Sequence, residues 1–263
     1  MMATRGVGVL LAVVLCTAAG RTQTWQSIDL GNTIAGSTTF VSSTSLTIAG
    51  NGDDIWNNFD GCRFVYLRAN RDCEIIARIT AQQNTSVWAK AGVMIRQSPT
   101  SGSMHAGMFR TPANGMAFQW RPATAGVSNN SNGGSNALPR WLRMRRVGNT
   151  FSGFYAPDVG GLPGAWTQQG GSTLIMMSDS VCIGLAVSSH MYGVLSTCSF
   201  NQLVTTGTVR GAGFVVGDAR EPSPLPRPST FAPARLNRLL FRTVPGLPMR
   251  EQDRRWAAAV EKR

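Results

Sequence analysis

The chain has 263 residues, enough for one large domain or two small ones, and 43% of them are hydrophobic, which supports a packed core. Only 14% are charged, against about 25% in ordinary soluble domains. Gly, Ser, Thr and Asn fill the difference, a composition that favours many short strands joined by turns. After residue 20 no segment has the roughly 20 apolar residues of a transmembrane helix, so we expect no helical membrane anchor there.

Residues 1–20 have the pattern of a signal peptide. Arg5 supplies a positive start, residues 6–16 are apolar but too short to span a bilayer, and small residues follow at 17–19. Cleavage is expected near Ala19 or Gly20. Lipoprotein processing at Cys16 is the alternative, and the bulky Leu15 before it disfavours that alternative. We therefore expect a secreted, extracellular protein.

Four cysteines remain after the leader, and an even number in an oxidising compartment predicts two disulfides. They are Cys62, Cys73, Cys182 and Cys198. Four cysteines allow three connectivities, of which Cys62 with Cys73 and Cys182 with Cys198 is the short-range choice. The sequons at Asn84 and Asn129 would matter only in a eukaryotic source.

From residue 24 to 207 the apolar residues alternate with period 2, which predicts strands. Turn-forming segments such as "GNGDD", "PTSGS" and "SNNSNGGSN" separate them. No amphipathic segment of helical length occurs there. The alternation predicts twelve strands at 27–30, 38–42, 45–50, 62–69, 73–83, 87–97, 105–112, 115–122, 140–147, 150–157, 181–190 and 196–204. This spacing predicts an all-β fold, an antiparallel β-sandwich or jelly roll.

Residues 208–263 differ from the rest. They contain seven of the 13 prolines and 11 of the 25 Lys and Arg residues, and half of the net charge of +12 lies there. We expect a linker and a disordered basic tail. Such a tail attracts polyanions, and for a secreted protein acidic glycans or cell-envelope polymers fit better than a specific nucleic acid.

Several segments together resemble a known group of domains. "WQSIDLGNTIAGSTTF", "DIWNNFDGCRFVY", "WAKAGVMIR", "GNTFSGFYAPD" and "GLAVSSHMYGVLSTCSFNQL" are similar to secreted concanavalin A-like lectin/glucanase domains of the regulation-of-enolase-protein branch. The resemblance runs from about Trp25 to Val204 and implies two curved antiparallel sheets with a concave face. Its members often accompany glycan-active modules and carry no single activity. The four cysteines and the basic tail depart from that pattern.

Catalytic chemistry is sparse in residues 24–207. Glycosidases need two carboxylates at close range, and this part of the chain has one glutamate, Glu74, with no E-x-D-x-x-E pattern around it. His105 and His190 lie in no catalytic motif and are expected to make structural hydrogen bonds. Asp53, Asp54 and Asp60 are weak candidates for a Ca²⁺ site, with turn and cap roles as the alternative. We therefore predict no enzyme activity and no required cofactor.

Three of the predicted strands alternate between an apolar face and a face of rings and cations; in 140–147, for example, Leu142 and Met144 are expected to point inward. If they share a sheet, eight side chains form one surface: Trp88, Lys90, Arg96, Gln119, Arg121, Trp141, Arg143 and Arg145. Flat rings stack on sugars, and guanidinium groups bind carboxylate or sulfate. The alternative is that the two tryptophans pack under loops or against each other, covered by arginine stems.

The sequence thus predicts a secreted, non-catalytic, lectin-like sandwich that binds carbohydrate, with a preference for acidic glycans. One alternative is a glycoside hydrolase of the same fold with an unrecognised carboxylate pair. Another is a structural or adhesive envelope protein whose basic tail binds a polyanion.

Overall fold

The computed structural model describes residues 25–208 and 217–220, which form an all-β unit. The described residues contain no helix, and hence no helical segment able to cross a membrane. The predicted signal peptide and most of the predicted tail lie outside them. One short piece of the region predicted as tail, β18 (Gly217–Arg220), pairs in parallel with β1 (Gln26–Leu30).

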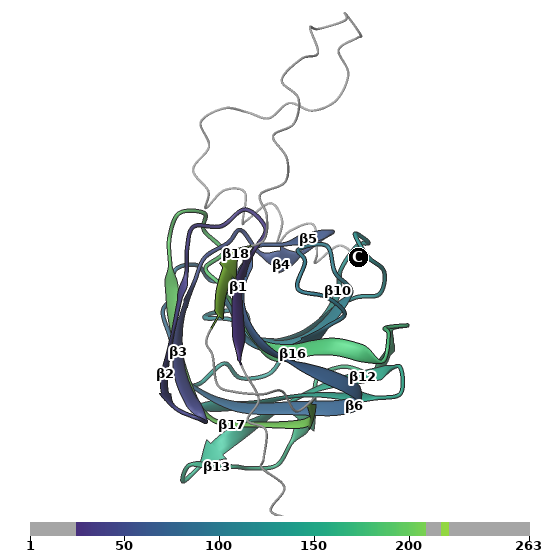
Figure 1. The fold of residues 1–263 in the computed structure, drawn as a ribbon. Coiled ribbons are helices and arrows are strands. Elements are labelled where there is room, and N and C mark those ends of the chain that lie inside the picture. Colours follow the sequence, from purple (N-terminus) through teal and green to yellow (C-terminus); the bar gives the residue numbers. More distant parts are fainter. Residues whose placement is uncertain (1–24, 209–216, 221–263) are drawn as a thin grey trace, which may run out of the picture. The chain divides into compact units, whose positions relative to one another are not determined.

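The strands form two sheets connected through one long strand, β6 (Cys62–Gln82) (Figure 1). Its first half pairs with β1 and with β16 (Ser180–Ser188), and its second half pairs with β11 (Arg140–Val147) and β17 (Ser196–Thr208). Arg71, between the halves, has a left-handed backbone with φ of 56°. The two strands predicted at 62–69 and 73–83 are therefore one strand that passes from one sheet to the other.

Sheet 1 contains the first half of β6. On one side of β6 lies β16, followed toward the edge by β7 (Lys90–Arg96), β8 (His105–Arg110), β9 (Met116–Arg121) and β10 (Asn129–Gly133). On the other side of β6 lie β1 and then β18. Neighbours pair antiparallel except β1 and β18.

Sheet 2 contains the second half of β6. Its other strands are β2 (Ser37–Ser42), β3 (Ser45–Gly50), β17, β11 and β12 (Thr150–Val159), with the short β13 (Leu162–Pro163), β14 (Thr167–Gln168) and β15 (Thr173–Leu174) along β12. Two further short strands, β4 (Ile55–Trp56) and β5 (Phe59–Asp60), form a separate hairpin.

The hydrophobic core lies between the two sheets and takes alternate residues from each strand. On β6 the odd-numbered residues from Val65 to Ile79 enter it, except the left-handed Arg71. Leu142 and Met144 of β11 also face inward, as the alternation predicts. Since alternate residues point to opposite faces of a strand, the charged and aromatic residues between them are on the outer faces of the sandwich.

Candidate functional site

The structure separates the eight predicted ligand-binding residues. Strands β7 and β9 belong to sheet 1 and β11 belongs to sheet 2. Lys90, Arg96, Gln119 and Arg121 therefore lie on the outer face of sheet 1, with Trp88 just before β7. Trp141, Arg143 and Arg145 lie on the outer face of sheet 2. The expectation that all eight share one surface is wrong, because β6 divides these strands between two sheets.

The outer face of sheet 1 is covered by the segment 51–61, which includes the β4–β5 hairpin. Ile55 of this segment packs into a second apolar cluster with Phe64, Met94 and Phe109 on that face. The ends of the segment meet closely, since a Cβ on Gly52 would lie 2.0 Å from the Gly61 carbonyl oxygen. Lys90, Arg96, Gln119 and Arg121 are consequently all buried.

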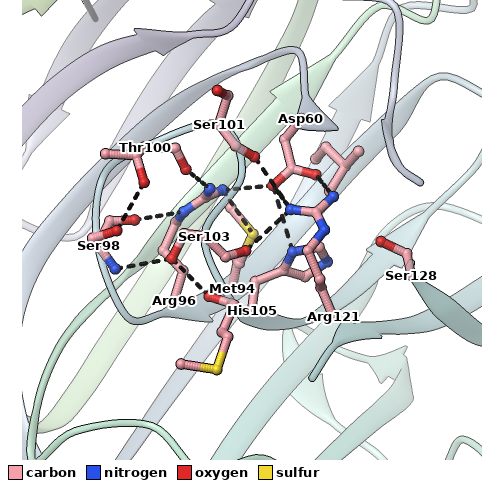
Figure 2. Close-up of polar contacts among 12 residues, drawn as sticks. Asp60, Met94, Arg96, Ser98, Thr100, Ser101, Ser103, His105, Arg121 and Ser128 are labelled. Atoms are coloured by element: carbon pink, nitrogen blue, oxygen red, sulfur yellow. Dashed lines mark hydrogen bonds and ion pairs between the residues drawn. The ribbon is translucent and has the colours of Figure 1, made fainter. Parts of the chain in front are cut away.

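Asp60 joins the hairpin to sheet 1 through an ion cluster. Figure 2 shows its carboxylate flanked by two guanidinium groups, with His105 beside it. The Arg121 guanidinium donates two hydrogen bonds, from Nη1 at 2.9 Å and Nη2 at 2.6 Å, and Arg96 Nη1 lies 3.0 Å from Oδ2. Such bidentate charge-assisted pairs are among the stronger interactions available to a buried carboxylate.

Backbone carbonyls take up further donors of both arginines. Arg121 donates to the carbonyl oxygens of Trp56, Asn57, Ser101 and Ser103. Arg96 donates to the carbonyls of Ser98 and Thr100. Both side chains are fully buried in this arrangement, so these arginines hold loops in place.

Burial decides the charge states in this cluster. Burial lowers the pKa of His105, against the pull of Asp60, so the imidazole is neutral at pH 7. Its Nδ1 lies 3.4 Å from the Asp60 carboxylate, and its Nε2 has no hydrogen-bond partner among the described residues. Burial alone would raise the pKa of Asp60, but its cationic neighbours hold it well below the usual range. With His105 neutral, this lowering depends on the two arginines.

The aspartates proposed as weak Ca²⁺ ligands are thus held by cations. Asp60 pairs with two arginines and Asp54 pairs with Lys90, while Asp53 is exposed. Across the described residues no three His, Cys, Asp or Glu side chains are grouped so that they could hold a metal. Calcium binding at these positions stays a prediction that this geometry does not support.

The outer face of sheet 2 is partly exposed, and Arg143 packs there against two rings. Its guanidinium carbon is 5.2 Å from the centroid of Phe154 and 5.8 Å from that of Trp166. Its Nε donates to Glu74 Oε2 at 2.6 Å. The Arg143 side chain is 23% exposed, whereas that of Arg96 on sheet 1 is fully buried. A cation over ring faces, fixed by a carboxylate, is a preorganised recognition group.

A second polar group borders Arg143 on the same face. Arg78 donates to both oxygens of Asp158, at 2.6 and 3.0 Å, and Trp141 Nε1 donates to Oδ1 at 2.9 Å. The hydrogen bond from Arg78, followed by that from Trp141, lowers the pKa of Asp158 to about 2. Trp141 is itself buried, so it supports the face and presents little ring area to a ligand.

A shallow pocket of about 390 Å³ opens beside Arg143. Its lining includes Glu74, Arg143, Arg145 and Arg146. Arg146 is buried and donates to backbone carbonyls, while Arg145 is exposed and makes no ion pair or hydrogen bond with any described residue. Arg145 is therefore the cation here that is available to an incoming anion.

We call the outer surface of sheet 2 formed by these groups the arginine–aromatic face: Glu74, Arg78, Trp141, Arg143, Arg145, Phe154, Asp158 and Trp166. Three of its members, Trp141, Arg143 and Arg145, are predicted site residues. Phe154 and Trp166 were not predicted as site residues. The cross-strand pairing of Arg143 with Phe154 follows from antiparallel alternation once β11 and β12 are known to pair. Trp166 lies in a loop, where alternation gives no signal.

The four cysteines are free and buried, so the predicted disulfides are not formed. Cys62 and Cys182 lie in the cluster under the hairpin, whereas Cys73 and Cys198 lie in the core between the sheets. Side chains on opposite faces of a sheet cannot be bridged without moving the backbone. The two cysteines within each cluster are also far apart along β6. Cys182 pairs with Arg68, roughly 20 Å along β6 from Cys62. Cys198 pairs with Gln82, nine residues along β6 from Cys73.

No protein-family model matches the chain. No curated protein matches it either. Among solved structures it is similar to a functionally unknown protein from Saccharomyces cerevisiae, with 18% identity over 72% of this chain and 97% of that one and a TM-score of 0.52. That likeness shows a shared fold.

Two further similar structures have TM-scores below 0.5. A legume lectin-like domain from Entamoeba histolytica has 7% identity, covers 71% of this chain and 91% of its own, and has a TM-score of 0.45. A glycoside hydrolase family 43 protein from Bacillus licheniformis has 11% identity and a TM-score of 0.48, and the match covers 67% of this chain but 38% of that protein. The fold is the all-β antiparallel sandwich that the sequence predicts, and the regulation-of-enolase branch stays a prediction.

Proposed function

We propose that this protein is secreted and that the arginine–aromatic face of sheet 2 binds carbohydrate without catalysing a reaction on it. The observation that supports the proposal is Arg143, which packs against Phe154 and Trp166, is oriented by Glu74 and stays partly exposed. A sugar presents apolar C–H faces to a ring and hydroxyl groups to a guanidinium and a carboxylate, so these groups match both of its surfaces.

The ligand class we favour is an acidic glycan. Arg145 has no partner among the described residues and borders the pocket next to Arg143. A uronate carboxylate or a sulfate there would make charge-assisted hydrogen bonds. A neutral sugar would use the rings and leave Arg145 in water.

The two carboxylates of this face argue against a glycosidase at the same place. Glu74 is bonded to Arg143, and Asp158 is bonded to Arg78 and Trp141. Glycosidases need one carboxyl that stays protonated near neutral pH, whereas the pKa of Asp158 is lowered to about 2, first by the hydrogen bond from Arg78. Asp158 is thus a poor general acid.

A glycan array with the full chain tests the proposal, followed by titration calorimetry on any hit. Trp166→Ala is expected to weaken binding at least tenfold, because a stacking ring is lost. The matched control is Phe59→Ala, which removes an exposed ring on the sheet 1 side. Binding that survives Trp166→Ala and Arg143→Ala unchanged would contradict the proposal and direct attention to the basic segment after residue 208.

A further inference from the structure

Three polar side chains from three different loops meet at one end of sheet 1. Asp54 precedes β4, Ser86 lies in the loop before β7, and His190 follows β16. Ser86 Oγ lies 3.3 Å from His190 Nδ1, and His190 Nε2 lies 3.5 Å from Asp54 Oδ2. A hydroxyl, an imidazole and a carboxylate thus follow one another in the order that nucleophilic acyl transfer uses.

One neutral tautomer of His190 satisfies both contacts. With the proton on Nε2, the ring donates to Asp54 and leaves Nδ1 as an acceptor for the Ser86 hydroxyl. That is the tautomer a general base requires, because the nitrogen nearest the nucleophile is unprotonated. Both distances are long for hydrogen bonds, as is common in catalytic groups without substrate.

The carboxylate of this trio is ionised and held. Lys90, a buried cation of β7, forms an ion pair with Asp54 Oδ1, which leaves Oδ2 to face His190. Burial alone would raise the pKa of Asp54, but the charge of Lys90, followed by the hydrogen bond with His190, brings it below the usual value. Asp54 can therefore orient the imidazole and stabilise its protonated form.

The backbone at His190 is in an unusual conformation. Its φ is 54°, in the left-handed region that non-glycine residues seldom occupy and that often marks functional positions. The neighbouring residues hold it there: the Asn51 amide donates to the carbonyls of Met191 and Val194, and Thr85 Oγ1 donates to the Ser189 carbonyl. The hydrogen bond from Thr85 to Ser189 also connects the loop that contains Ser86 to the loop that contains His190.

We infer that Ser86, His190 and Asp54 form a second site, a hydrolytic centre for O-acyl esters, independent of the proposed glycan face. The side chains of His190 and Asp54 are 23% and 25% exposed, so small reactants reach them. The Trp88 N–H donates to Ser86 Oγ at 3.2 Å and would favour its negatively charged form.

The proposed hydrolysis needs no co-reactant other than water. Ser86 Oγ attacks the ester carbonyl carbon while its proton moves to His190 Nδ1. The C–O bond of the tetrahedral intermediate then breaks, and His190 returns the proton to the leaving alcohol. Water, deprotonated by the same nitrogen, attacks the carbonyl carbon of the acyl–Ser86 ester. The bond from this carbon to Ser86 Oγ then breaks, the carboxylic acid leaves, and His190 returns the proton to Ser86 Oγ.

A fluorophosphonate probe, which modifies activated serines covalently, tests this inference on the full chain. Peptide mass spectrometry is expected to find the label on Ser86. His190→Asn is expected to slow labelling by roughly 100-fold or more, the size of a general-base contribution. Asparagine tolerates a left-handed backbone, so this variant keeps the local fold. Hydrolysis of p-nitrophenyl acetate should fall in parallel.

The control is Ser98→Ala, which removes a hydroxyl bonded to Thr100 and not to a histidine, and which should label like the unmodified chain. Ser86→Ala should not be labelled, and its thermal unfolding curve shows whether it folds. A wild-type chain that resists the probe would overturn the inference. So would labelling of Ser86 at an unchanged rate in His190→Asn.

Discussion

The two outer faces of the sandwich start from similar residues and end with opposite properties. Each has arginines and rings at alternate positions of its strands. On sheet 1 the β4–β5 hairpin covers them, and Asp60 takes up both Arg96 and Arg121. On sheet 2 the arginines hold no comparable hairpin among the residues that the structure describes, and Arg143 stays partly exposed against two rings. The same residue types therefore hold a loop in one place and can receive a ligand in the other.

The largest effect is expected from breaking the ion cluster on sheet 1. Asp60→Asn leaves two buried guanidinium groups without their carboxylate, which should lower the free energy of unfolding by roughly 3–5 kcal/mol. Urea denaturation measures this. Asp179→Asn is the control, because its ion pair with Arg71 is exposed and should change stability by less than about 1 kcal/mol. Equal effects of the two substitutions would mean that the cluster does not hold the hairpin.

A large effect is also expected on thiol reactivity. Burial raises the pKa of Cys73 and Cys182 to about 11 and that of Cys198 to about 12, so few thiolates exist at neutral pH. Iodoacetamide should leave the folded protein unmodified at these positions and modify them all after unfolding without reductant. Disulfide-linked peptides in a non-reduced digest would contradict the observed state of the four cysteines, which are free and buried.

A moderate, pH-dependent effect is expected on sheet 2. The pKa of Asp158 falls from 3.8 to about 2 on folding, mainly through the hydrogen bond from Arg78. Because the folded value is the lower one, its stabilising contribution is present above pH 3.8 and is lost as the pH falls toward 2. The difference in urea midpoint between wild type and Asp158→Asn should shrink across that range. A difference that stays constant from pH 5 to pH 2 would show that Asp158 is not coupled to folding.

The smallest effect tests the preference for acidic ligands. Arg145→Ala should weaken binding of an acidic glycan a few-fold, more at low salt than at high salt, and should leave a matched neutral glycan unaffected. Arg68→Ala, which removes an exposed arginine of sheet 1, is the control. If both arginine variants lower binding equally, general positive charge and not the pocket beside Arg143 attracts the ligand.

Strand positions were predictable because alternation is a local property of the chain. Eleven strands of the structure overlap the twelve predicted segments, and two of those segments merge into β6. Seven strands of the structure lie outside the predicted segments. The strands β4, β5, β13, β14 and β15 were missed because two residues carry no periodic signal. The strand β10 was missed because its segment was predicted to be a turn, and β18 because its segment was predicted to be part of the tail. The orientation of Leu142 and Met144 into the core was also predicted correctly, which placed Trp141, Arg143 and Arg145 outside.

The candidate site could be predicted only in part. Alternation shows that Arg121 and Arg143 both point away from the core, and it cannot show what lies over them. Asp60 meets Arg121 across 61 positions of the chain, and Trp166 reaches Arg143 from a loop with no periodic pattern. His190 was expected to make structural hydrogen bonds because it lies in no catalytic motif. Its contacts with Ser86 and Asp54 join residues more than 100 positions apart, so local patterns do not reveal them.

The sequence by itself determined the strands, their inward and outward residues and the antiparallel all-β class, because all three follow from period-2 alternation between neighbours along the chain. Only the tertiary structure decided which strands share a sheet, which arginines are neutralised and which stay open to a ligand. Those outcomes depend on the crossing of β6 between the sheets and on the hairpin that closes over one of them. Both arise from contacts between distant segments, which local alternation does not record.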